Sequence, residues 1–281
     1  MCQQLMCCGY VSYGTKEYCA NYFLRQLNVD FNMMQFNRIS FMINSTHQPD
    51  QQSLRYILQS DKLCISRNPR GTDKGVKSYI DKFYERHFAV YQNQPINLME
   101  IGFRHGASLA LWSKYFSKGV ILGVDNFSDA AIGQDLPVVE EWINLHNVKI
   151  SIGDAYSNLF AEKIVGQFDI IIDDGPHTLS AQQIALELYL PKLKPTGIFV
   201  VEDILSGGLA IFPLLRMVPV GFNVYFYDFR WHRVCGDNCL FVVELNNGSF
   251  GWLNRGVIIL LGFLYLLTEG PLRLLKKVLK G

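Results

Sequence analysis

Short apolar runs recur along the middle of the chain and alternate with stretches whose apolar residues have helical spacing. Residues 168–172 are the plainest run, because their apolar and β-branched composition is typical of a strand buried on both faces. The pattern predicts strands at residues 96–99, 120–124, 148–152, 168–172 and 197–201. It predicts helices within residues 78–90, 138–145 and 180–193, and another that follows the turn at residues 102–106 and runs through residues 112–116.

Two later segments follow a different rule. Apolar and polar residues alternate in steps of two at residues 222–229 and 240–244, which predicts an antiparallel pair of strands. Strands that alternate with helices along a chain form a doubly wound, mostly parallel sheet. We therefore expect an α/β fold of Rossmann-like type, with the late pair as an antiparallel terminal hairpin.

The two ends of the chain differ from this central part. We expect an irregular, partly helical N-terminal extension at residues 1–71, the α/β domain at residues 72–249 and an apolar, basic tail at residues 250–281. Within the extension, residues 16–27 and 52–63 have helical spacing. The pattern leaves open whether the extension covers a site or joins two copies into a homo-oligomer.

Charge and cysteine content narrow the function classes. Residues 72–249 hold 14 Lys/Arg and 20 Asp/Glu, a balance of −6, so we expect no nucleic-acid partner for this domain. The seven Cys are an odd number without the spacing of a disulfide framework or a zinc site. The N-terminus lacks the basic segment and long apolar run of a signal peptide. These features favour a cytoplasmic protein with reduced thiols.

Acidic residues gather where two of the predicted strands end. Asp173, Asp174 and His177 follow one strand, and Glu202 and Asp203 follow another. Parallel strands bring their carboxyl ends to one edge, where ligands bind in open α/β sheets. Four carboxylates in one crevice are costly unless a cation compensates them, so we expect a divalent cation such as Mg²⁺ there.

A glycine-bearing turn after the first strand suggests a second ligand. Gly102 and Gly106 allow a sharp bend and a close approach to a ligand, and Ser108 lies at the start of the following helix. Asp125 ends the next strand, where a carboxylate can bind ribose hydroxyls. Glu100 precedes the first glycine; it would repel a pyrophosphate but suits a cofactor with a sulfonium and an amino group.

Two further acids complete this predicted cofactor site. Asp154 ends the third strand and can accept a hydrogen bond from an adenine amino group. Asp173 is the other acid assigned to the cofactor, S-adenosylmethionine. Acids at successive strand ends are a stronger indication together than any one of them alone.

These motifs resemble those of class I S-adenosylmethionine-dependent methyltransferases. The sequences are Glu-x-Gly-x-x-x-Gly, Gly-Val-Asp, Gly-Asp-Ala, Ile-Ile-Asp-Asp-Gly-x-His and Val-Glu-Asp. More narrowly, residues 72–245 resemble the metal-dependent O-methyltransferases that modify sugars on macrolide antibiotics, of the macrocin and mycinamicin type. The preceding Thr-Asp-Lys-Gly and the late Asp-Asn-Cys-Leu fit this family as well.

The resemblance implies roles for individual residues. Asp174, Glu202 and Asp203 would hold Mg²⁺, and His177 would be the general base that deprotonates a hydroxyl of a small-molecule acceptor. Arg104 departs from the pattern, because many methyltransferases have a glycine in the middle of this turn. The acceptor stays open between a glycoside or other glycosylated natural product, a lipid-linked sugar and a small phenol.

Two other functions fit the sequence less well. A nicotinamide-dependent oxidoreductase would need a Gly-x-Gly-x-x-Gly turn, which Arg104 and Glu100 do not fit. A non-catalytic, membrane-associated binding protein on the same scaffold would not need the set Asp174, His177, Glu202 and Asp203.

The C-terminal tail has a pattern of its own. Residues 257–267 are an unbroken apolar run, too short to span a bilayer, and Gly270-Pro271 is expected to break the chain and start a new helix. On a helical wheel the following Leu and Val residues fall opposite Arg273, Lys276, Lys277 and Lys280. The pattern of residues 257–280 therefore predicts either a helix packed on the core or a peripheral contact with an anionic membrane.

Overall fold

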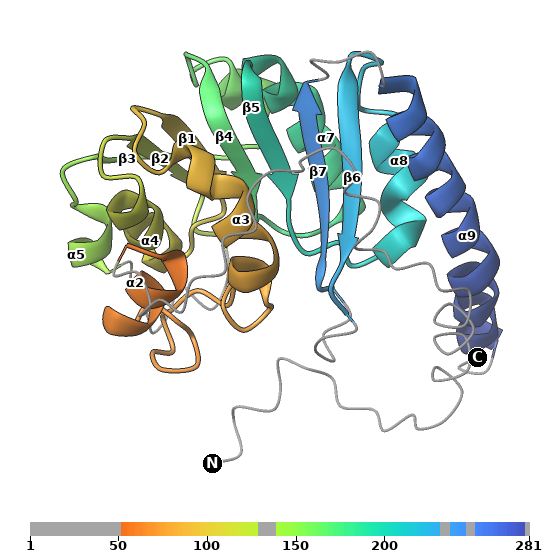
Figure 1. Ribbon diagram of the computed structural model, residues 1–281, viewed down its shortest axis with the longest axis horizontal. Coiled ribbons are helices and arrows are strands. Elements are labelled where there is room, and N and C mark those ends of the chain that lie inside the picture. Colours follow the sequence, from red (N-terminus) through yellow and green to blue (C-terminus); the bar gives the residue numbers. More distant parts are fainter. Residues whose placement is uncertain (1–51, 129–138, 231–236, 246–250, 279–281) are drawn as a thin grey trace, which may run out of the picture. The chain divides into compact units, whose positions relative to one another are not determined.

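A seven-stranded sheet organises the part of the chain that the structure describes. The computed structural model describes residues 52–128, 139–230, 237–245 and 251–278 (Figure 1). The strands are β1 (Asn97–Ile101), β2 (Val120–Asp125), β3 (Val148–Ile152), β4 (Phe168–Asp173), β5 (Leu193–Val201), β6 (Phe222–Asp228) and β7 (Cys239–Leu245). Their order in the sheet is β3-β2-β1-β4-β5-β7-β6.

The strand directions confirm the predicted fold class. The strands β3, β2, β1, β4 and β5 run parallel, and β7 pairs antiparallel with both β5 and β6. Asp173 pairs with Ile101 on one side and with Val201 on the other, so the residues that follow these three strands emerge side by side. This is the doubly wound sheet with an antiparallel terminal hairpin that the alternating pattern predicted.

Alternate strand residues build two hydrophobic cores, one on each face of the sheet. Ile170 and Ile172 of β4 pack with α2 (Leu54–Ser60), the π-helical turn η2 (Ile80–Tyr84), α3 (Glu85–Phe88), α4 (Ala107–Tyr115) and α5 (Glu140–Ile143). Ile171 and the opposite face pack with α6 (Asn158–Ala161), α7 (Leu179–Tyr189), α8 (Ile211–Leu215) and α9 (Gly251–Val278). The helices thus form a layer on each side of the sheet.

Several helices differ from their predicted extents. The stretch 78–90 is a π turn, α3 and the 3-10 turn η3 (Ala89–Tyr91) rather than one regular helix. The helix predicted over residues 180–193 ends at Tyr189, continues as the 3-10 turn η4 (Leu190–Lys192) and gives way to β5 at Leu193. Pro191 lacks an N–H for the helical ladder, which explains this early end. The structure also adds α6, α8 and the 3-10 turn η5 (Gly207–Ala210), which the pattern missed.

The predicted break at Gly270-Pro271 is wrong. Helix α9 runs through both residues, from Gly251 to Val278. A proline inside a helix costs about 3 kcal/mol. Long helical stretches on both sides, rich in Leu before it and in Leu and Lys after it, favour helix strongly enough to offset that cost.

Helix α9 lies along β6, the last strand of the sheet (Figure 1). Asn254 of α9 makes two hydrogen bonds to the backbone of Val224 in β6. Its Oδ1 accepts from the Val224 N–H at 2.7 Å, and its Nδ2 donates to the Val224 carbonyl at 3.0 Å. The side-chain amide therefore makes the two hydrogen bonds to Val224 that the backbone of a neighbouring strand would otherwise make.

Two further outcomes concern the ends of the chain. The helix predicted at residues 52–63 is present as α2, whereas the one predicted at residues 16–27 lies outside the described residues. Among the residues that the structure describes, no helix combines the length and apolar content needed to cross a bilayer. The division into segments 1–71, 72–249 and 250–281 stays a prediction.

Candidate functional site

A cavity of about 650 Å³ opens at the edge of the sheet where the parallel strands end. The turns after β1, β2, β3, β4 and β5 line it, and residues 70–73 from the segment before η2 form another wall. This is the edge at which open parallel sheets bind ligands, and it is where the sequence placed both predicted sites.

The turn after β1 depends on glycine. Gly102 has φ +82°, and a Cβ there would lie 2.2 Å from the backbone oxygen of Asp174. A side chain at this position would therefore push the turns after β1 and β4 apart. Gly106, with φ +95°, precedes α4, and the first turn of that helix borders the cavity through Ala107 and Ser108. The predicted pairing of glycine turn and helix start is present.

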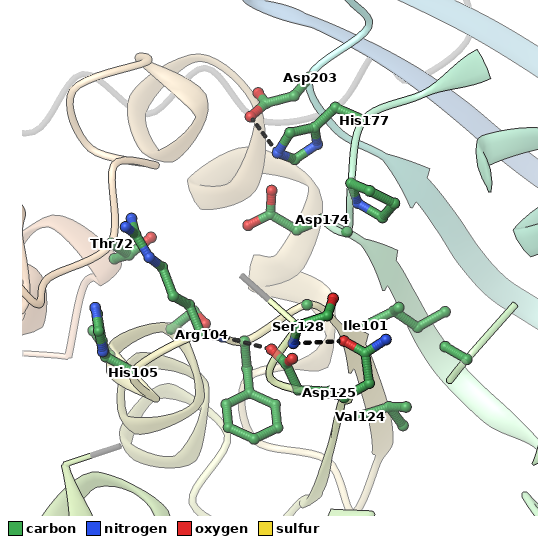
Figure 2. Close-up of a pocket in the computed structure, with 18 of the residues that line it drawn as sticks. Thr72, Ile101, Arg104, His105, Val124, Asp125, Ser128, Asp174, His177 and Asp203 are labelled. Atoms are coloured by element: carbon green, nitrogen blue, oxygen red, sulfur yellow. Dashed lines mark hydrogen bonds and ion pairs between the residues drawn. The ribbon is translucent and has the colours of Figure 1, made fainter. Parts of the chain in front are cut away.

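Two predicted cofactor acids reach the cavity from β2 and β3. Asp125 Oδ2 accepts from the Arg104 N–H at 2.9 Å (Figure 2). Its Oδ1 accepts from the Phe127 N–H at 2.8 Å. Asp154 lines the same cavity and accepts from the Tyr156 N–H at 3.0 Å. Backbone amides close in sequence thus orient both carboxylates.

Asp174, His177 and Asp203 come together on another wall of the cavity (Figure 2). Each offers one ligand atom, and these atoms lie within 4.8 Å of one another. His177 Nε2 lies 3.5 Å from Asp203 Oδ2. His177 and Asp203 have φ of +57° and +56°, which non-glycine residues rarely adopt. Such conformations persist where the surrounding structure enforces them, often at functional sites.

Lys74 lies beneath this cluster, and sequence reasoning missed it. Its buried ammonium lies 2.6 Å from Asp174 Oδ2, 2.8 and 2.9 Å from the two oxygens of Glu202, and 3.3 Å from Glu100. Burial alone would lower the pKa of Lys74, but the three carboxylates outweigh it and hold that pKa well above its usual value. In the sequence, Lys74 is marked only as part of the Thr-Asp-Lys-Gly motif.

A second lysine, three residues later in the same turn, holds Asp203. The ammonium of Lys77 contacts Asp203 and lies 3.1 Å from Asp73 and 3.4 Å from Asp237. The Tyr79 hydroxyl donates to Asp203 Oδ1 at 2.7 Å. Burial nevertheless raises the pKa of Asp203 to about 6. The motif Asp-Lys-Gly-Val-Lys places two cations three residues apart before a predicted helix, but this spacing does not identify their acidic partners.

Glu202 differs from its neighbours in exposure. Its side chain is 1% exposed, against 17% for Asp174. Both of its oxygens accept from Lys74, and Tyr84 also donates to it. Burial, reinforced by the charge of Asp174, raises the pKa of Glu202 well above its usual value. In this arrangement Glu202 faces the lysine rather than the cavity.

Two other predicted cofactor residues lie behind the cavity wall. Glu100 is fully buried against Lys74, and burial raises its pKa. Asp173 accepts from the Tyr156 hydroxyl at 2.7 Å, and burial raises its pKa to about 6. Neither residue lines the cavity in the structure, so direct contact with a cofactor stays a prediction for both.

The donor set fits a hard divalent cation. Five buried or half-buried carboxylates, those of Glu100, Asp173, Asp174, Glu202 and Asp203, meet only the two ammonium groups of Lys74 and Lys77 among the contacts described above. The carboxyl groups thus outnumber the two ammonium groups around the cavity. Asp174 and Asp203 supply carboxylate oxygens, which Mg²⁺ prefers, and His177 adds a nitrogen beside them.

Comparison with known proteins defines the class. Residues 99–204 match a family model described as "Methyltransferase domain". The chain therefore contains a methyltransferase domain, and its sheet order and terminal hairpin are those of the Rossmann-like methyltransferase fold. The resemblance inferred from the motifs is confirmed at this level.

Particular relatives are O-methyltransferases. The 8-demethyl-8-(2-methoxy-alpha-L-rhamnosyl)-tetracenomycin-C 3'-O-methyltransferase of Streptomyces olivaceus is 33% identical over 138 residues, which cover 46% of this chain and 33% of the relative. Mycinamicin VI 2''-O-methyltransferase of Micromonospora griseorubida is 28% identical over 159 residues, which cover 50% of this chain and 37% of the relative. The chain thus matches only about a third of the length of these relatives.

A solved structure shares the fold. The MycE methyltransferase from the mycinamycin biosynthetic pathway, in complex with Mg, SAH and mycinamycin VI, superposes with a TM-score of 0.50 at 20% identity. The superposition covers 83% of this chain and 62% of that one.

Proposed function

We propose that the chain transfers a methyl group from S-adenosylmethionine to a hydroxyl of a sugar or glycosylated natural product, with Mg²⁺ as metal cofactor. The observation that carries the proposal is one cavity bordered by the glycine turn and Asp125 on one wall and by Asp174, His177 and Asp203 on another. The named substrates of the relatives, which are rhamnosyl tetracenomycins and mycinamicin VI, support the acceptor class.

The cofactor would occupy the wall built by the first three strands. Gly102 and Ser108 border the space that it would fill, and Gly106 precedes the helix α4 that carries Ser108. Asp125 would accept from the two ribose hydroxyls, because its carboxylate already faces the cavity in a fixed orientation. Asp154 would accept from the adenine amino group.

Asp174 and Asp203 would hold the metal, with Glu202 as the third predicted ligand. Glu202 could join only if one of its oxygens exchanged Lys74 for the ion, because Lys74 bonds to both in the structure. When bound, Mg²⁺ supplies positive charge that acidifies a hydroxyl, and S-adenosylmethionine supplies an electrophilic methyl. Lys74 would keep the metal-side carboxylates in place from below.

His177 would act as the general base at Nε2. The acceptor hydroxyl would give its proton to this nitrogen, and its oxygen would bond to the methyl group that S-adenosylmethionine supplies, with the carbon–sulfur electron pair leaving on sulfur as a neutral thioether. Asp203 Oδ2, 3.5 Å away, stabilises the imidazolium that results. The cavity wall holds the reacting groups together, and this positioning supplies much of the rate.

The direct test is transfer of labelled methyl from S-adenosylmethionine to rhamnosyl tetracenomycin or mycinamicin acceptors, with and without EDTA. We expect labelled product that EDTA abolishes and added Mg²⁺ restores. Full turnover in metal-free protein would contradict the metal assignment.

Binding provides a separate test of the cofactor. Titration calorimetry should detect S-adenosylhomocysteine binding and no comparable binding of NAD. Tight NAD binding without S-adenosylhomocysteine binding would instead support an oxidoreductase.

A further inference from the structure

The outer face of α9 is apolar and largely exposed among the described residues, although Phe263 also packs edge-on against Phe212 of α8. Its inner face is held by Asn254 on β6 and by the buried Ile258 and Leu261. On the other side, large apolar side chains are 38–74% exposed, and these are Leu253, Val257, Ile259, Leu260, Phe263, Leu264, Leu266 and Leu267. Contiguous exposed apolar surface of this kind marks an interaction site.

The width of this face indicates what covers it. Leu253, Val257, Leu260, Leu264 and Leu267 follow one another at steps of three and four residues, which places them in one line along the helix. Ile259, Phe263 and Leu266 widen the line to about half of the helix circumference. A partner helix in a coiled coil covers only a narrow seam. A surface this broad fits a plane better than a second helix.

The charge of the same helix indicates the chemistry of that plane. Residues 250–281 contain five Lys/Arg and one acid, a balance of +4. The one acid, Glu269, is already bonded to Arg230. Four of the cations, Arg273, Lys276, Lys277 and Lys280, come after the apolar face in the sequence. An apolar face followed by a basic cluster is the arrangement of helices that lie on anionic membranes.

We propose that α9 docks the protein on an anionic lipid bilayer, with its outer face in the lipid and its axis along the membrane plane. The docking needs no helix that spans the bilayer. It does not depend on the methyltransferase assignment, because no residue of the cavity takes part.

The structure also relates the docked helix to the cavity. Tyr265 donates to Asp228 Oδ2 at 2.8 Å, and Glu269 is bonded to Arg230, which is itself bonded to Asp228. Asp228 ends β6, which runs in the same direction as β5 because each pairs antiparallel with β7. The C-terminal half of α9 is therefore anchored at the sheet edge that carries the cavity. Docking would hold this edge close to the lipid, where an acceptor embedded in the membrane could reach it.

Flotation of the full chain with vesicles tests the proposal. We expect the protein to float with vesicles of phosphatidylglycerol and phosphatidylcholine and to stay at the bottom with phosphatidylcholine alone. The double variant Leu260→Gln/Leu267→Gln should need at least about tenfold more anionic lipid for half-binding, because two large apolar groups no longer enter the lipid.

The matched control replaces two apolar residues that are equally exposed but lie outside α9. Leu159 is 74% exposed, as is Leu267, and Val220 is 81% exposed. Leu159→Gln/Val220→Gln should therefore bind vesicles like the unchanged protein. All these side chains are at the surface, and circular dichroism of each variant checks that the fold is kept.

The charge contribution is tested by Lys276→Gln/Lys277→Gln, which should weaken binding to anionic vesicles and make it less sensitive to salt. Failure of the unchanged protein to float would overturn the proposal. Flotation that both α9 variants leave intact would also overturn it. So would a dimer in light scattering that Leu260→Gln/Leu267→Gln dissociates while flotation is unchanged, because the face would then bind a second copy.

Discussion

The two walls of the cavity hold their carboxylates by different means. On the wall from β1, β2 and β3, Asp125 and Asp154 accept from backbone amides at most 21 residues away and lie at the cavity surface. On the wall from β4 and β5, Asp174 and Glu202 accept from Lys74, which is 100 and 128 residues away in sequence. One wall is built locally, and the other depends on a buried cation from a distant segment.

The difference predicts different consequences of mutation. Loss of a group on the local wall removes one contact to a ligand and little else, because solvent reaches the site. Loss of the buried cation leaves several carboxylates in the interior without a partner, and an uncompensated buried charge is far more costly than an exposed one. Mutations on the wall from β4 and β5 should therefore lower both the activity and the free energy of unfolding. Mutations on the other wall should lower the activity without a comparable loss of stability.

The largest effect is expected at Lys74. Lys74→Met should lower the free energy of unfolding by about 3–5 kcal/mol, because Glu202, Glu100 and Asp174 lose their common partner. Urea denaturation measures the change. The control is Lys114→Met, whose partner Asp61 is partly exposed, and it should cost at most about 1 kcal/mol. Equal losses in the two variants would show that the buried cation has no special role.

His177 should affect rate rather than stability. His177→Ala is expected to lower kcat by roughly 10²–10⁴ and to leave the affinity for S-adenosylhomocysteine unchanged, since the base is absent but the cofactor wall is intact. His146→Ala, at an exposed histidine outside the cavity, serves as control and should keep full activity. Undiminished turnover in His177→Ala would show that His177 is not the general base.

Asp125 tests the local wall. Asp125→Ala should weaken S-adenosylhomocysteine binding by about 1.5–3 kcal/mol through loss of a charged ribose contact. Titration calorimetry measures it, with the surface variant Asp81→Ala as control. The free energy of unfolding should fall much less than in Lys74→Met. A loss of stability as large as that of Lys74→Met would break the distinction between the two walls.

The effect of pH is the smallest within any one pH unit. Because burial raises the pKa of Asp173 to about 6 from the ordinary 3.8, the folded state binds more protons than the unfolded state between these values. The free energy of unfolding should therefore fall as pH rises from about 4 to 6, by at most about 1.4 kcal/mol per pH unit for this group. Asp203, raised to the same value, contributes a similar slope.

Asp173→Asn should reduce this slope, and denaturation at several pH values measures it. Asp228 provides a contrast of opposite sign. Burial would raise its pKa, but the hydrogen bonds and charge of Arg230 outweigh burial and lower it. Its contribution to stability is lost as pH falls below about 4. Asp228→Asn should therefore reduce the pH dependence of the free energy of unfolding only in this acid range. An unchanged slope in Asp173→Asn would mean that its carboxyl is not protonated in the fold.

The comparison of the two walls also explains what the sequence could predict. Strand ends, the glycine turn and the acids of β1 to β5 were predictable, because the side chains that follow parallel strands must meet at one edge. The contact of Asp174 with His177 and Asp203 follows from the pairing of β4 with β5 in the same way.

Lys74 and Lys77 were not predictable by this reasoning. Their segment lies before the first strand, and no periodicity indicates that it folds beneath the ends of β4 and β5. The expectation that a divalent cation alone would compensate the acids was therefore incomplete, because a lysine lies between Asp174 and Glu202. The continuous helix α9 was missed for a related reason, since a local rule for proline ignores the helical turns on both sides.

The pair of hydrogen bonds between Asn254 and Val224 has a consequence for self-assembly. The last strand of a sheet exposes backbone groups that can recruit a strand from another molecule and begin aggregation. At Val224 of β6 both of these groups are already bonded by one side-chain amide. A helix thus occupies the place of an eighth strand, and at this point of the sheet the resistance to growth beyond seven strands depends on a single asparagine.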